Sequence, residues 1–175
     1  MNFSLISSTN TNNKFPNLEL VSKKQFQLAD LQSSLDNNEL VIKYILFERK
    51  LAIFSITATN ISWELRPWTS KEIDLVETYV STLKSSQYNS DIANKFGEIL
   101  LPNIPKNIQK IVINPDGELY KIPFETIQLN NQFLTETYET RYTSNLKFIH
   151  LEDNIKQETT LAIYAPAYEG NTTAL

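Results

Sequence analysis

The chain is 175 residues long, with 41% hydrophobic residues, 21% charged residues and a formal net charge of −4. This length is typical of one globular domain that buries a substantial core. The mild negative charge provides no basic surface for nucleic acid, so we expect no nucleic-acid partner. The chain has no cysteine, which excludes disulfides, thiolate metal sites and a cysteine nucleophile within it.

Neither a secretory signal nor a membrane helix is predicted. The first residues, Met1–Ile6, lack a basic region followed by a long apolar stretch. No apolar run approaches the ~18 residues that a membrane helix needs, so we expect a soluble, cytoplasmic protein without membrane contact. Residues 1–21 are rich in Ser, Thr and Asn. We predict a flexible N-terminal segment there and a folded domain over residues 22–175.

The first predicted elements are one helix and three strands. Ser22 and Gln25 form a capping-box pair that predicts a helix over Ser22–Leu35, with leucines at helical spacing. Three runs of alternating residues follow, separated by short turns: Leu40–Leu46, Leu51–Thr57 and Ile61–Leu65. Consecutive strands joined by short turns form an antiparallel meander.

Two helices and a buried strand are predicted next. Thr69 and Glu72 form a second capping box, at the start of a helix that ends near Lys84. Its apolar stripe is Ile73, Val76, Val80 and Leu83. A third helix is predicted over Asp91–Leu101. The β-branched run Ile108–Ile113 lacks alternation, which is typical of a parallel strand buried on both faces.

The rest of the chain completes a mixed pattern. We predict extended structure over Leu119–Ile122 and Phe133–Tyr142, and a short helix from a Ser144 cap through Leu151. Thr160–Ala165 is a second short apolar strand. The order predicts an α/β fold in which an N-terminal helix and an antiparallel β-meander precede helices and the first strands of a mainly parallel sheet. No helix follows the last strand, so we expect further sequence or a partner to cover its apolar edge.

The most distinctive motifs are Pro115-Asp116-Gly117, directly after a buried strand, and Pro123-Phe124-Glu125 shortly after it. With their neighbours they resemble the first half of a CHAT domain. This caspase-like protease domain is related to separase and is often found behind TPR repeats in bacteria. The resemblance covers roughly residues 22–175. It is carried by Gln25–Leu46, Leu51–Trp68, Asp91–Leu101, Ile111–Gly117, Ile122–Thr126, Glu139–Asn145 and Leu161–Tyr168.

The resemblance implies a fold and a partner but no catalytic residue in this chain. The family's catalytic histidine and cysteine lie on strands downstream of the segment like Leu161–Tyr168. The chain is therefore expected to be the non-catalytic N-terminal part of a caspase-like cysteine endopeptidase, scaffolding the core that carries the His/Cys dyad. We expect no cofactor and no metal in this chain. The partners that the resemblance implies are the C-terminal catalytic half, from the same chain or after processing, a TPR sensor region and a protein substrate.

One loop is a candidate for contact with the active-site rim. In open α/β sheets function gathers at the carboxyl ends of strands, and Pro166 and Tyr168 follow the last predicted strand. His150, the single histidine, falls away from the family's catalytic position. We expect it at the surface or at a helix end.

The remaining polar and aromatic candidates are predicted to be structural. Asp116 belongs to a turn signal, and Glu125 is expected to accept hydrogen bonds from backbone amides. If exposed, Trp63 and Trp68 would be interface anchors; core positions are favoured, since Trp63 alternates with Ile61 and Leu65. The three glycines, Gly97, Gly117 and Gly170, form no phosphate loop or dinucleotide fingerprint, and the ligand count excludes zinc.

Two other functions stay open at this point. The first is a stand-alone pseudoprotease or protein-interaction module, which would cover Thr160–Ala165 by self-association. The second is a hydrolase that uses the carboxylates of Glu118 and Glu125. Paired carboxylates perform acid–base chemistry when their environments separate their pKa values, so this function requires both residues to line one pocket.

Overall fold

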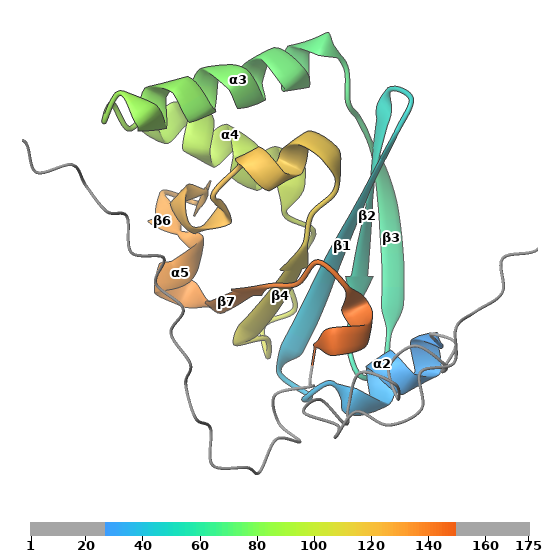
Figure 1. Ribbon diagram of the computed structural model, residues 1–175. Coiled ribbons are helices and arrows are strands. Elements are labelled where there is room, and N and C mark those ends of the chain that lie inside the picture. The colour runs from blue at the N-terminus through green and yellow to red at the C-terminus, as the bar shows by residue number, and fades with distance from the viewer. Residues whose placement is uncertain (1–26, 150–175) are drawn as a thin grey trace, which may run out of the picture.

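The computed structural model of the protein describes residues 27–149 (Figure 1). The helices and strands are, in chain order, α2 (Leu28–Ser34), β1 (Glu39–Phe47), β2 (Lys50–Ile56), β3 (Ile61–Pro67), α3 (Ser70–Lys84), α4 (Ser90–Leu100), β4 (Lys110–Asn114), β5 (Gln128–Leu129), β6 (Gln132–Phe133), α5 (Leu134–Thr137) and β7 (Glu139–Tyr142). Three short 3-10 helices complete the order: η1 (Gly117–Lys121), η2 (Phe124–Thr126) and η3 (Leu146–Phe148).

A five-stranded sheet in the order β3-β2-β1-β4-β7 forms the centre of the described fold. Strand β2 pairs antiparallel with β1 and with β3, as the predicted meander requires. Strand β4 pairs parallel with β1 on one side and with β7 on the other. The predicted mixed α/β fold is therefore confirmed, and the buried apolar run at Ile111–Ile113 occupies a central parallel strand.

Helices α3 and α4 cover one face of this sheet, which we call the helix face. The large core lies between them and the even-numbered residues of β1, since Leu40, Ile42 and Tyr44 are all buried there. The connection from β4 to β7 also lies on this face, because Leu119, Phe124 and Leu134 join the same cluster. Aromatic side chains dominate the deepest positions, including Tyr44, Tyr79, Phe96 and Phe124.

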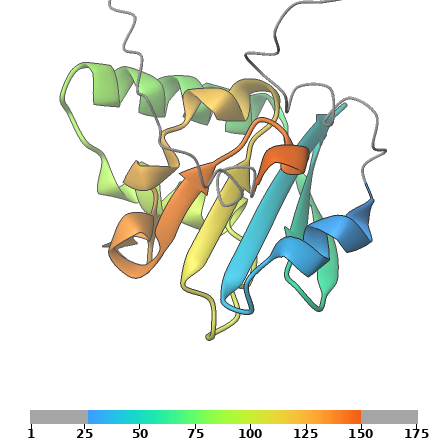
Figure 2. The ribbon, with the colours of Figure 1, turned by 60° about the horizontal axis from the view of Figure 1, so that its bottom comes forward.

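Among residues 27–149, the opposite face of the sheet is covered at one end only, and we call it the α2 face. Leu31 and Leu35 of α2 pack there against a small cluster from the strands, Val41, Ile56 and Val112. Leu146 and Ile149, at and just beyond η3, add to this cluster. Figure 2 shows α2 and η3 on the other side of the strands from α3 and α4.

The helix ends follow the signals in the sequence. Thr69 and Glu72 form the predicted capping box at the start of α3, and α3 ends at Lys84 as expected. Helix α4 starts one residue earlier than predicted, with the Asn89 side chain accepting a hydrogen bond from the Ile92 N–H at 3.1 Å. Side-chain oxygens at this position satisfy N–H groups that have no partner inside the helix.

Several local predictions are wrong. Helix α2 begins at Leu28, because Gln27 has extended backbone angles, so a continuous helix from Ser22 is excluded. The segment around Leu119–Ile122 is a 3-10 helix, and Phe133–Tyr142 contains the short helix α5 before β7. In η3 the capping side chain is Asn145 in place of Ser144.

Burial corrects two further expectations. Trp68 is in the core with 3% of its surface exposed, but Trp63 is 63% exposed. On α3 the predicted stripe residue Ile73 is exposed, while Tyr79 is buried. The reason is the same in both cases, because periodicity shows which residues share a face without showing what covers that face.

Other predictions fall outside the described residues. These are the N-terminal segment 1–21, the Ser22–Gln25 pair, His150, the Thr160–Ala165 strand, and the rim candidates Pro166 and Tyr168. Within residues 27–149, none of the helices has the length and hydrophobicity needed to span a bilayer.

Candidate functional site

The two sequence motifs meet at the carboxyl ends of the parallel strands. Pro115-Asp116-Gly117 directly follows β4, and Pro123-Phe124-Glu125 packs beside the end of β7 at Tyr142. In α/β sheets this edge is where ligands and catalytic groups usually gather. It is therefore the first place to look for chemistry in this chain.

Asp116 joins the ends of two neighbouring strands. Its carboxylate Oδ2 accepts a hydrogen bond from the backbone N–H of Leu46 at 2.8 Å. Gly117 follows with a φ of +52°, a left-handed conformation that favours glycine. A Cβ at this glycine would lie 2.9 Å from the Leu46 Cδ1 atom. The motif thus closes a turn against β1 and leaves the Asp116 carboxylate engaged in a structural contact.

Glu118 serves a different partner. Its Oε1 accepts a hydrogen bond from the indole Nε1–H of Trp68 at 2.6 Å. Because Trp68 is almost fully buried, its N–H needs an acceptor inside the protein. Glu118 supplies that acceptor and holds the start of α3 to the loop after β4.

The Pro123-Phe124-Glu125 motif is organised by Tyr142. The Tyr142 hydroxyl accepts a hydrogen bond from the Phe124 N–H at 2.8 Å and donates one to the Glu125 Oε2 atom at 2.7 Å. The Phe124 ring packs between Tyr44 and Tyr142, with centroid distances of 5.5 and 6.2 Å. Partial burial raises the pKa of Tyr142, and the hydrogen bond to Glu125 and its negative charge raise it further.

This geometry corrects the role predicted for Glu125. The backbone amide that follows Pro123 is taken by the Tyr142 hydroxyl, and Glu125 accepts from that hydroxyl instead of from the backbone. Thr126, the next residue, accepts a hydrogen bond at its carbonyl from the Tyr79 hydroxyl at 2.8 Å. The Pro-Phe-Glu motif therefore connects β7 to α3 through side-chain contacts.

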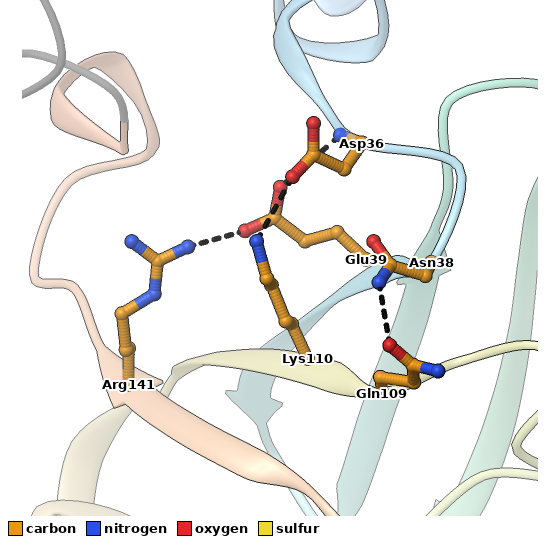
Figure 3. A network of polar contacts seen from close by, with 6 residues as sticks. All are labelled: Asp36, Asn38, Glu39, Gln109, Lys110 and Arg141. Carbon is orange, nitrogen blue, oxygen red and sulfur yellow. Dashed lines mark hydrogen bonds and ion pairs between the residues drawn. The ribbon is translucent and has the colours of Figure 1, made fainter.

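A second polar cluster lies at the opposite, amino-terminal ends of the parallel strands (Figure 3). Glu39, at the start of β1, is fully buried, and its Oε1 atom is 2.6 Å from Arg141 Nη2 of β7. Lys110 of β4 forms an ion pair with Asp36 at 3.0 Å. The hydrogen bond and negative charge of Asp36 raise the pKa of Lys110. The cluster clamps β1, β4 and β7 together at this edge.

Sequence reasoning missed this cluster. The one signal was a glutamate at the head of an apolar strand, because a buried carboxylate requires a paired charge. Its partner Arg141 is 102 residues away, so no local pattern identifies the pair.

Neither edge holds a catalytic arrangement among the described residues. Glu118 and Glu125 contact different aromatic side chains, and neither borders the polar cavity of about 400 Å³ that lies beside α4. In residues 27–149 no group of three His, Cys, Asp or Glu side chains is placed to hold a metal ion. Near that cavity the Asn94 amide already donates to Gln128 and Asn131, so these amides serve to hold α4 against β5.

Comparison with protein families gives one match. Residues 88–173 match part of the family model described as the CHAT domain. No curated protein matches the chain.

The match confirms the resemblance over the part of the chain that contains both motifs. The CHAT segment includes α4, β4, the two motifs and β7. The meander β1–β3 and helix α3 precede the matched range, although they form one sheet and one core with it. Within the caspase-like CHAT segment the carboxylates of Asp116 and Glu125 accept hydrogen bonds from Leu46 and Tyr142, and the chain has no cysteine.

Proposed function

We propose that this chain is the non-catalytic N-terminal portion of a CHAT-type caspase-like cysteine endopeptidase. In this function it scaffolds the protease core that carries the histidine and cysteine. Its partners are that catalytic half, a TPR sensor region and, through the core, a protein substrate. Pro166 and Tyr168 are proposed to contact the rim of the active site.

The observation that carries the proposal is how the acidic side chains are used at the edge formed by the carboxyl ends of the parallel strands. In a sheet of this type that edge normally carries the chemistry. Here Asp116 and Glu125 are both used to hold strands and loops together. A cysteine-free chain with a partial CHAT match and a braced sheet is suited to supporting a core supplied by other residues.

The described sheet also offers surfaces for such support. Strands β3 and β7 lie at its two edges, with a pairing partner on one side only in residues 27–149. Unpaired strand edges are the surfaces through which a sheet is extended by further strands. The β7 edge is polar, since Glu139, Thr140 and Arg141 make up most of the strand.

The test is reconstitution with a catalytic half supplied as a separate polypeptide. The chain and a His- and Cys-bearing half of a CHAT peptidase are expressed alone and together, then assayed with a panel of fluorogenic peptides. We expect no hydrolysis by the chain alone, co-elution of the pair on size-exclusion chromatography, and peptide hydrolysis that iodoacetamide abolishes. A Glu98→Ala variant of the chain, changed at an exposed position of α4, should reconstitute equally well.

Two results would contradict the proposal. Hydrolysis by the chain alone would favour the carboxylate hydrolase and would be lost in Glu125→Gln. Failure of two folded partners to associate would favour a stand-alone interaction module. For the rim, Tyr168→Ala should change the kcat/KM of the reconstituted pair, and an unchanged value would remove that residue from the active-site rim.

A further inference from the structure

An apolar patch on the α2 face of the meander is uncovered in the described structure. Its members are the exposed side chains Ile45, Phe47, Ile61, Trp63 and Leu65, which we call the open patch. On β3 the guanidinium of Arg66, the residue after Leu65, donates hydrogen bonds to the carbonyls of Glu98 and Leu101 on the helix face. Because side chains alternate along a strand, Trp63 and Leu65 point to the opposite face.

The open patch continues across neighbouring strands. Trp63 is paired with Phe54, and Leu65 with Ala52, so apolar side chains adjoin from β3 into β2. Exposed apolar surface gathered in this way marks an interaction site in a soluble protein. Helix α2 and η3 occupy the same face, but they cover only its end near Val41 and Ile56.

The chain itself turns toward this patch after β7. Leu146 and Ile149 pack on the α2 face against residues of β1, β2 and β4. The backbone has therefore left the β7 edge and crossed back over the sheet, as Figure 1 shows for the orange segment in front of β1. Ile149, the last described residue, therefore lies on the face that carries the open patch.

The handedness of the connections between strands also supports a path from β7 back toward β3. The connections from β3 to β4 and from β4 to β7 both run along the helix face and both advance toward β7. Crossovers between parallel strands almost always have one hand. A connection from β7 to a further parallel strand of the sheet would have that hand on the α2 face only if it advanced the opposite way, toward β3. The crossing direction of η3 agrees with this rule.

Charge indicates which end of the chain covers the open patch. Lys43 and Lys50 lie on the same face of the strands as the open patch. Of the carboxylates on that face of the strands, Glu39 is buried and paired with Arg141, and Glu139 is on β7, at the edge of the sheet away from the open patch. Residues 150–175 contain four acidic residues and one lysine, whereas residues 1–26 contain three lysines and one acidic residue. The C-terminal segment therefore complements the lysines, and the N-terminal segment does not.

We propose that residues 150–175 of this chain cover the open patch. The apolar run Leu161–Tyr164 packs against Trp63 and Leu65, and the acidic residues lie beside Lys43 and Lys50. The distance permits this, because the residues between Ile149 and Leu161 extend to roughly 40 Å, while three strands are only about 10 Å across. Residues 150–173 also fall inside the CHAT match. The inference concerns the chain by itself and goes beyond the scaffold function.

The test is a photo-cross-link from the centre of the patch in the full-length chain. Trp63 is replaced by p-benzoylphenylalanine, the monomer is isolated after irradiation, and the cross-linked peptide is identified by mass spectrometry. We expect cross-links within residues 150–175 of the same molecule. Benzoylphenylalanine at Tyr120, which is also exposed but lies in η1, should give no cross-link to that segment.

Every other outcome overturns the inference. A cross-link to a second copy would make the patch a dimer interface, and one to residues 1–26 would identify the other end as the cover. No protein cross-link in a folded monomer would show that the patch faces solvent. An independent check is acrylamide quenching of the two tryptophans. Ile163→Ser should increase the quenching of tryptophan fluorescence and shift the emission to the red. Ile73→Ser, in helix α3, should change neither.

Discussion

The carboxylate of Asp116 accepts a hydrogen bond from the backbone N–H of Leu46, joining residues 70 positions apart in sequence. The contact lies where β1 extends beyond its parallel partner, since the pairing with β4 ends at Lys43 and Asn114. Leu46 would otherwise present a partly buried N–H without a strand neighbour on that side. A turn motif of the CHAT segment therefore completes a strand that precedes the matched range.

Replacing Asp116 should test this contact directly. Asp116→Ala leaves the Leu46 N–H without its acceptor, and we expect the free energy of unfolding to fall by about 1–2 kcal/mol. Urea unfolding measures the change. Asp116→Asn keeps a side-chain oxygen acceptor and should lose less. Equal losses in the two variants would show that the hydrogen bond is not the cause.

A second prediction concerns Gly97 in α4. A methyl group at this position would overlap the backbone carbonyl of Gln128. We therefore expect Gly97→Ala to lower the melting temperature, although alanine in a helix is normally better than glycine by about 1 kcal/mol. The overlap forces α4 away from β5 and costs roughly 1–3 kcal/mol. Calorimetry gives the melting temperature of Gly97→Ala, and Glu98→Ala, a change at an exposed neighbouring residue, is the control. A higher melting temperature for Gly97→Ala would refute the close approach of α4 to β5.

The ion pair between Glu39 and Arg141 should show strong coupling. Arg141→Met removes the guanidinium that is bonded to the buried Glu39 carboxylate, and we expect a loss of about 1–3 kcal/mol, toward the low end because Arg141 is partly exposed. The double variant Glu39→Gln/Arg141→Met removes both charges and should lose less than the sum of the single variants. Urea unfolding of all four proteins gives the coupling free energy. Additive losses would contradict a coupled pair.

Stability should fall at alkaline pH. Burial raises the pKa of Tyr44 and of Tyr142, and it raises the pKa of Tyr88 to about 12. An unfolded chain releases these protons near pH 10, the ordinary value for tyrosine, while the folded chain retains them. The stabilisation is therefore complete below about pH 10 and declines as the pH rises above it.

Unfolding in urea at about pH 8 and about pH 11 measures this decline, since the two values bracket the ordinary tyrosine pKa. Tyr142→Phe removes one of the shifted groups, so its stability should fall less between the two conditions. An identical decline in the variant would exclude Tyr142 from the effect.

The local elements were predictable because backbone geometry imposes its period on the sequence. Residues two apart share a face of a strand, and this alternation identified the three strands of the meander. The capping box of Thr69 and Glu72 needs only residues within one turn, and it was confirmed. The uninterrupted β-branched run before Pro115 correctly predicted a parallel strand buried on both faces.

The two tryptophans show that local sequence patterns do not predict burial. Trp63 alternates with apolar residues as a core residue would, yet it belongs to the open patch. Trp68, which no alternation marks, is buried and bonded to Glu118. The difference depends on which face α3 and α4 cover, and that depends on the path of the chain after β3.

The amino-acid sequence alone therefore indicated the three meander strands, helices α3 and α4, the buried strand β4 and the resemblance of the segment around the two motifs to a CHAT domain. It also shows that the chain has no cysteine nucleophile. Only the tertiary structure decided that Glu39 pairs with Arg141, that Asp116 holds Leu46 and that Glu125 serves Tyr142. The physical reason is that these partners are brought together by the order and register of strands. Side-chain chemistry at any one position does not encode that order.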